Sequence, residues 1–107
     1  MLKHCKPCEG GVEPLSTEEA TRELSKLHQW NLEQDNKSIW KYWVFKNFSQ
    51  VMSFINAIAY ISNREQHHPD VSFGYNTVRV TYTTHAIHGL SENDFICASM
   101  VDALEAK

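Results

Sequence analysis

Two adjacent histidines, His67 and His68, stand directly before Pro69 in the stretch QHHPD, and a third, His85, follows two threonines in TTHAIHGL. Imidazole is the side chain that most readily exchanges protons near neutral pH. Pro69 disfavours helical geometry at His68, so His67 is expected near the end of a helix. The negative end of the helix dipole favours a protonated ring there. Together the three histidines predict a general acid–base site.

The same histidines have less specific interpretations. His67 and His68 are equally well explained as surface residues at a helix end, and His85 alone is more typical of a structural side chain at the end of a strand. Three histidines can also hold a catalytic zinc ion. However, the carboxylates that usually orient ligating histidines are not obvious in the sequence, so we expect no metal.

The chain has three cysteines, Cys5, Cys8 and Cys97. The Cys-x-x-Cys pair near the start resembles half of a zinc knuckle or a redox pair, but no second Cys/His pair accompanies it, and a flexible tail is the better explanation. Cys97 falls within a predicted helix, where a cysteine usually packs in the core. Since three cysteines cannot all pair within one chain, we expect reduced thiols and a cytosolic protein.

Length and composition point to a single globular domain. The 107 residues are 42% apolar and 21% charged, with a net charge of −3, which is the size and balance of one ordinary domain. The scattered lysines and arginines do not form the basic surface that nucleic-acid binding needs. No apolar run approaches the roughly 20 residues that span a bilayer, and the start of the chain has no hydrophobic signal core. We expect a flexible leader over residues 1–14 and one domain over residues 15–107.

Hydrophobic periodicity predicts three helices and four strands. Ser16 and Glu19 form a capping-box signal for a helix that Trp30 closes, and Ser91 with Asp94 is the equivalent signal for the last helix. The expected elements are helices from 17, over 48–64 and from 92, and hairpins of strands 31–33 with 38–45 and of strands on either side of Gly74 and Asn76. The fold class is therefore α+β. It is a four-stranded antiparallel sheet with three helices packed on one face, in the order α-β-β-α-β-β-α.

The stretch HHPD, followed by YNTVRVTYTTHAIHGLSENDF, resembles the pterin-4a-carbinolamine dehydratases, and the leader resembles that of some bacterial members. The resemblance covers about residue 16 to the end. It implies a hydro-lyase that converts 4a-hydroxytetrahydropterin to quinonoid dihydropterin without a metal or other cofactor. This reaction recycles the cofactor of aromatic amino acid hydroxylases, chiefly phenylalanine hydroxylase, which is a possible partner. Family members are homo-dimers or homo-tetramers.

The resemblance also implies site residues. His67, His68 and His85 are the catalytic set, with His67 as general acid, His85 as base, and His68 binding the substrate or acting on the other stereoisomer. The implied substrate-binding residues are Gln66, Pro69, Thr83, Thr84, Ala86, Trp30 and Asp94. Trp30 would stack on the flat pterin at the edge of the site, and Asp94 would support it.

Three positions depart from the family pattern. Gln66 replaces the Asn or Asp that many members have, Ala86 replaces an acidic residue, and His88 replaces a small one. No departure removes a histidine. The competing hypothesis is a non-catalytic dimerisation or coactivator-like protein that uses the same fold as a binding surface.

Overall fold

The computed structural model describes Cys5 and residues 13–105 of the chain. Most of the predicted leader therefore lies outside the described residues. The elements are α1 (Thr17–Leu24), β1 (Asn31–Leu32), β2 (Ile39–Val44), α2 (Phe48–Glu65), β3 (Asp70–Phe73), β4 (Thr77–Tyr82), a short 3₁₀ turn η1 (His85–Ile87) and α3 (Glu92–Glu105). The predicted order α-β-β-α-β-β-α is confirmed, and η1 is an addition between β4 and α3.

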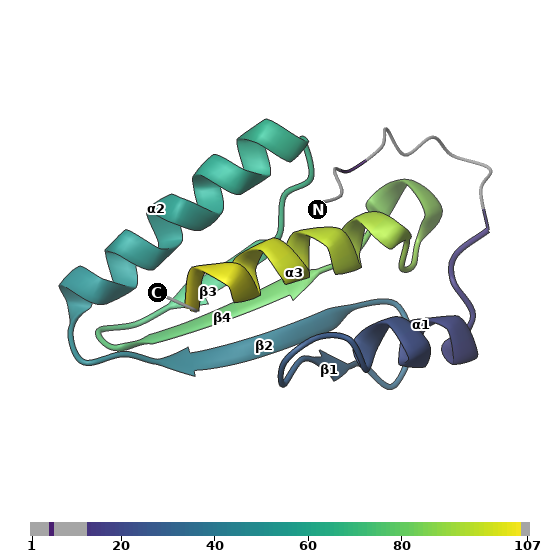
Figure 1. The fold of residues 1–107 in the computed structure, drawn as a ribbon, viewed down its shortest axis with the longest axis horizontal. Helices are drawn as coiled ribbons and strands as arrows, with labels where there is room; N and C mark the ends of the chain where they lie inside the picture. Colours follow the sequence, from purple (N-terminus) through teal and green to yellow (C-terminus); the bar gives the residue numbers. More distant parts are fainter. Residues whose placement is uncertain (1–4, 6–12, 106–107) are drawn as a thin grey trace.

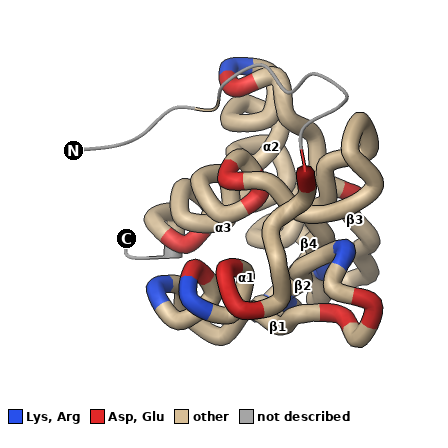
Figure 2. The backbone as a smooth tube through the Cα atoms, turned by 90° about the vertical axis from the view of Figure 1, so that its right-hand side faces the viewer, with Lys and Arg blue, Asp and Glu red and all other residues tan. Residues whose placement is uncertain are grey.

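The four strands form one antiparallel sheet in the order β1-β2-β4-β3. Each predicted hairpin is present, and the central pair β2–β4 joins them through six residue pairs from Ile39↔Tyr82 to Val44↔Thr77. Figures 1 and 2 show the helices on one side of this sheet, with α2 and α3 over β4 and α1 beside β1. This is the predicted α+β layer arrangement.

The first helix is shorter than the sequence predicts. Its capping box is confirmed: Glu19 N–H donates to Ser16 Oγ and Ser16 N–H donates to the Glu19 carboxylate. However, α1 ends at Leu24, and the chain reaches Trp30 through a turn in which Gln29 has a φ of 62°. A β-carbon makes such left-handed geometry costly within a helix, so the element cannot continue to Trp30.

The inner face of the sheet supplies much of the core. The alternation predicted for β4 is confirmed, because Val78, Val80 and Tyr82 are all fully buried. On β2 the inward positions are Ile39, Lys41 and Trp43. The charged Lys41 in this series requires a buried partner, since an unpaired ammonium group is expensive to remove from water.

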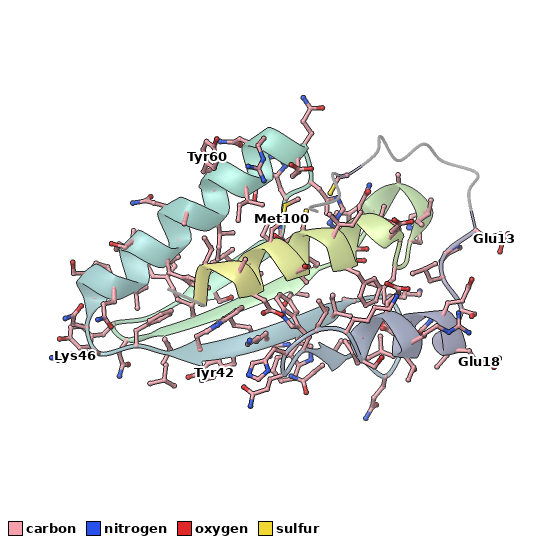
Figure 3. All side chains as sticks on the ribbon, in the orientation of Figure 1. Glu13, Glu18, Tyr42, Lys46, Tyr60 and Met100 are labelled. Carbon is pink, nitrogen blue, oxygen red and sulfur yellow. The ribbon has the colours of Figure 1, made fainter. Side chains whose placement is uncertain are left out.

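The opposite face of the sheet carries no helix among the described residues. Tyr42 points away from the helices (Figure 3), and both Tyr42 and Val44 are more than half exposed. The guanidinium of Arg79 lies over the Trp40 ring at 4.2 Å from its centroid, which partly shields that indole. In the described part of the chain no helix is both long enough and apolar enough to cross a membrane.

Candidate functional site

The centre of the candidate site is a buried His67–Asp94 pair. His67 lies just beyond α2 and Asp94 in the first turn of α3, and His67 Nε2 is 2.6 Å from Asp94 Oδ1. The His67 side chain is 11% exposed and that of Asp94 is fully buried. The imidazole also stacks on the Tyr82 ring, with the two planes 7° apart. The pair therefore joins the end of one helix to the start of another, above the end of β4.

Both carboxylate oxygens of Asp94 have hydrogen-bond partners. Its Oδ2 accepts from Ser91 N–H at 3.0 Å and from the Thr84 hydroxyl at 2.7 Å. Thr84 Oγ1 is in turn 2.7 Å from Ser91 Oγ, which accepts from the N–H of Asn93. A carboxylate with these donors on Oδ2 acts as an acceptor toward His67 as well, so Nε2 carries the proton. Nδ1 is then the ring nitrogen that remains for a substrate.

The predicted capping role of Asp94 is confirmed by its bond to Ser91 N–H. In a simple capping box the serine hydroxyl would accept from the backbone N–H of Asp94. Here Ser91 Oγ accepts from the backbone N–H of Asn93 instead. Asp94 therefore combines a structural bond at the helix start with direct contact to a candidate catalytic imidazole.

Gln66 ends α2 in a left-handed conformation, with φ 55° and ψ 40°. The N–H groups of Gln66 and His67 both donate to the carbonyl of Ser62. This turn redirects the chain so that His67 faces α3. Asn and Asp tolerate left-handed geometry better than other residues with a β-carbon. According to the resemblance, many family members have Asn or Asp at this position. The left-handed backbone of residue 66 is a physical reason for that preference.

Replacing Gln66 with glycine is expected to stabilise the protein by about 0.5–1 kcal/mol, because glycine adopts left-handed geometry without steric cost. The measurement is urea unfolding of the variant and the wild type. Ala59→Gly is the matched control: Ala59 is an exposed residue inside the same helix, so glycine there should destabilise by about 1 kcal/mol. A Gln66→Gly variant that loses as much stability as the control would contradict the strain argument.

His68 and His85 lie in more exposed positions than His67. His68 is exposed, and its Nε2 is 3.1 Å from the side-chain oxygen of Asn63 on α2. His85 is exposed at the start of η1 and follows Thr84 directly. The two adjacent histidines thus diverge, one toward α3 and the other back along α2. The backbone places His85 next to the cluster through Thr84, while no described hydrogen bond joins it to His67.

The segment around His85 is a closed loop. Thr84 and Gly89 form a two-residue bridge through reciprocal backbone hydrogen bonds, and η1 lies between them. A β-carbon on Gly89 would meet the Pro14 ring at 2.7 Å, so only glycine fits. His88 has a φ of 54°, which accounts for the small residue that the family pattern has there. Thr83 donates a hydrogen bond to the carbonyl of Lys37, and Ala86 is exposed on the loop.

Trp30 lies in the core, where it is 5% exposed and contacts the rings of Trp43 and Tyr82. Its Nε1 donates to Asp102 Oδ1 at 2.8 Å. Nearly all of its surface is therefore covered by this chain in the conformation described, so stacking on a ligand would require movement.

Asp102 is a residue that the sequence reasoning missed. Besides Trp30 it binds Lys41 Nζ at 3.2 Å and accepts from the backbone N–H of His28 at 3.1 Å. The Lys41–Asp102 ion pair joins β2 to α3 in an almost buried position. The sequence signal for it was Lys41 itself, because a lysine on the inward face of an alternating strand requires an acidic partner.

Among the residues that the structure describes, no group of three or more His, Cys, Asp or Glu side chains could hold a metal ion. Cys5 belongs to those residues, but Cys8 and His4 of the leader lie outside them, so the zinc-knuckle interpretation of the Cys-x-x-Cys pair rests in part on positions that are not described.

Comparison with known proteins identifies the family. Residues 13–104 match the family model "Pterin 4 alpha carbinolamine dehydratase". A protein of Nitrosospira multiformis is 57% identical over 102 residues, which are 95% of this chain and 88% of that protein. A protein of Nitrosomonas europaea is 59% identical over 103 residues, again 95% of this chain and 89% of its own length. Each carries the name "Putative pterin-4-alpha-carbinolamine dehydratase".

Two solved structures are also similar. The "transcriptional coactivator/pterin dehydratase" of Brucella melitensis aligns with a TM-score of 0.82 and 29% identity, over 86% of this chain and 98% of its own. A "pterin dehydratase-like protein" described as a RuBisCO assembly factor in the alpha-carboxysome aligns with a TM-score of 0.63 and 28% identity, over 72% and 89%. The chain therefore belongs to the pterin-4a-carbinolamine dehydratase family, whose enzyme class is the hydro-lyases.

Proposed function

We propose that this protein dehydrates 4a-hydroxytetrahydropterin to quinonoid dihydropterin by histidine acid–base catalysis. The reaction would return the cofactor that aromatic amino acid hydroxylases release. The observation that carries the proposal is the buried His67–Asp94 pair, formed by two separate parts of the family motif. A histidine held in one orientation by a buried carboxylate is a common arrangement for directed proton transfer.

The reaction needs two proton transfers and no change in oxidation state. The leaving 4a-hydroxyl must gain a proton to depart as water, and N5 of the pterin must lose one. In the proposal, His67 donates the proton from Nδ1 while Asp94 fixes its ring through Nε2. His85 accepts the N5 proton from its exposed position after Thr84, and His68 contacts the substrate. Gln66, Pro69, Thr83 and Ala86 complete the proposed binding surface, because they flank these histidines in the chain.

Stopped-flow measurement of 4a-hydroxytetrahydropterin decay, with and without the protein, tests this function. We expect the decay rate to rise in proportion to protein concentration and to saturate with substrate. A protein that neither binds a pterin nor changes the decay rate would reject the dehydratase function. If such a preparation formed a stable complex with another protein, the competing hypothesis of a non-catalytic binding protein would replace it.

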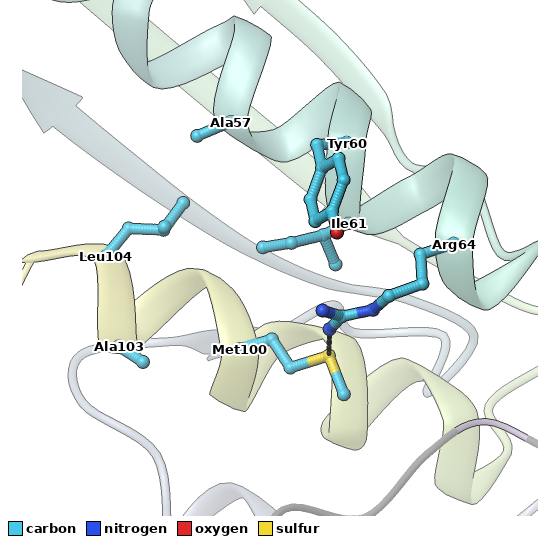
Figure 4. A pocket seen from close by; sticks show the side chains of 7 residues that line it. All are labelled: Ala57, Tyr60, Ile61, Arg64, Met100, Ala103 and Leu104. Atoms are coloured by element: carbon cyan, nitrogen blue, oxygen red, sulfur yellow. Dashed lines mark hydrogen bonds between the residues drawn. The ribbon is translucent and has the colours of Figure 1, made fainter.

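We also infer that the chain forms homo-dimers or homo-tetramers, because apolar side chains remain exposed on two surfaces. One is the open sheet face with Tyr42 and Val44. The other is a groove of about 350 Å³ between α2 and α3 (Figure 4), beside the 66% exposed Tyr60. The groove is lined by Ala57, Tyr60, Ile61, Arg64, Met100, Ala103 and Leu104. Exposed apolar surface of this kind is typical of subunit interfaces.

Light scattering coupled to size-exclusion chromatography measures the assembly. We expect a dimer or tetramer at micromolar concentration. Val44→Glu should shift the mass downward if the sheet face is the interface, and Tyr60→Glu should do so if the helix groove is, since a buried carboxylate is costly. A wild-type protein that elutes as a monomer across the concentration range would contradict the inference.

A further inference from the structure

Cys5 and Cys97 lie close together although 92 positions separate them in the chain, and their Sγ atoms are 3.3 Å apart. Cys97 is fully buried on α3, while Cys5 is half-buried. Both side chains pack with the core, but the proposed dehydration uses neither thiol. Two thiols at this distance can be linked by a small movement, because a disulfide requires about 2.05 Å between the sulfur atoms.

Further contacts hold Cys5 against both helices that carry the candidate site. Its backbone N–H donates to Glu65 Oε1 at 2.8 Å, at the end of α2, and its Sγ lies 3.7 Å from the carbonyl of Asn93, at the start of α3. Arg64 binds the other oxygen of Glu65 at 2.9 Å. Cys5 therefore bridges the residues that directly precede QHHPD and directly precede Asp94.

The environment separates the chemical roles of the two sulfur atoms. The hydrogen bond from Cys97 lowers the pKa of Cys5, against the opposing effects of burial and of the nearby carboxylates. The same bond, together with burial, raises the pKa of Cys97. Since the thiolate is the reactive form of cysteine, the accessible Cys5 is the nucleophile, and Cys97 is the thiol that responds once Cys5 has reacted.

We propose that Cys5 and Cys97 form a reversible disulfide bond with each other. The oxidant is a low-molecular-weight disulfide, such as glutathione disulfide. The Cys5 thiolate attacks one sulfur of the oxidant and expels one thiolate, leaving a mixed disulfide on Cys5. Cys97 then gives up its proton to the departing thiolate and attacks Cys5 Sγ, which expels the second small thiol. The two protein thiols lose two electrons, and the oxidant is reduced to two thiols.

The disulfide would fasten the Cys5 segment across the ends of α2 and α3 and close a loop of more than 90 residues. Closing a long loop restricts the unfolded chain, so the oxidised form should be the more stable one. The bond would also tie Cys5, which donates a hydrogen bond to Glu65 at the end of α2, covalently to α3. This inference concerns a modification site, and it stands whether or not the protein dehydrates pterins.

The test uses the full-length chain in graded mixtures of glutathione and glutathione disulfide, followed by acid quenching, alkylation under denaturing conditions and peptide mass mapping. We expect a Cys5–Cys97 link within each chain, no disulfide between chains, and one alkylated cysteine, Cys8. Its melting temperature should exceed that of the reduced chain by several degrees and return on treatment with dithiothreitol. Cys8→Ser should form the same link and show the same shift, whereas Cys5→Ser should show neither.

Several outcomes would overturn the proposal. These are a Cys5–Cys8 link in the wild type, a disulfide between two chains, or a mixed glutathione disulfide on Cys5 that leaves Cys97 open to alkylation. The Cys5→Ser variant keeps a side chain of similar size at a half-buried position, so it should fold, and its melting temperature in the reducing buffer checks this directly.

Discussion

A double variant, His67→Gln with His85→Ala, is expected to lose catalysed dehydration while it keeps its fold. Each acid–base group typically contributes about 10²–10⁴ in rate, so His67→Gln alone should lower the catalysed rate by that factor. Glutamine is the informative replacement because its amide can still donate to Asp94 in place of the Nε2 proton. It cannot, however, take up or release a proton near neutral pH. The loss can then be assigned to proton transfer and not to an empty space beside Tyr82.

The matched control is His28→Ala. His28 is exposed, lies outside the motif and contributes only its backbone N–H to Asp102 among its described hydrogen bonds. The control should therefore dehydrate the pterin at the wild-type rate. Stopped-flow decay of 4a-hydroxytetrahydropterin measures activity, and thermal unfolding of each variant confirms the fold. If the double variant turned over at the wild-type rate, the protons would have to move through other groups, and the assignment of His67 and His85 would fail.

Local patterns in the sequence predicted most of the fold because they act over a few residues. Val78, Val80 and Tyr82 alternate with polar residues, which predicts a strand with these three side chains on its buried face. The structure buries all three fully. Ser16 with Glu19 fixed the start of α1 for a similarly local reason. The predicted end of α1 was wrong. The left-handed turn before Trp30 is made by Gln29, and no glycine in the sequence marks it.

The arrangement of the site could not be predicted in the same way. Adjacent histidines have identical local signals, and which one faces inward depends on the turn at Gln66 and on a carboxylate 27 positions after His67. The sequence placed Asp94 as a cap and as support for the site, but its bonds to His67 and Thr84 arise only when α3 packs against β4 and α2. The Cys5–Cys97 contact is the extreme case, since the two residues lie near opposite ends of the chain.

Asp94→Asn is expected to lower both activity and stability, for two separable reasons. An amide oxygen can still accept from His67, but the amide nitrogen would face Ser91 N–H, which loses its acceptor, and the Thr84 hydroxyl, which would have to turn toward Ser91 Oγ. Leaving a buried donor without an acceptor costs about 1–3 kcal/mol, so we expect a loss of that order. Removing the carboxylate that orients an essential histidine typically costs about 10–100-fold in activity.

Thr84→Val separates the two effects, because it removes one donor to Asp94 and leaves the carboxylate and its bond to His67 in place. We expect it to lose about 1 kcal/mol and to lose less activity than Asp94→Asn, because the carboxylate still orients His67. Nitrogen-15 NMR of the imidazoles supplies a further readout: in the wild type and Thr84→Val, the neutral His67 ring should be protonated at Nε2, and in Asp94→Asn this preference should weaken. If Asp94→Asn kept full activity with an unchanged His67 tautomer, Asp94 would be a helix cap alone, and His67 would need no carboxylate to do its work.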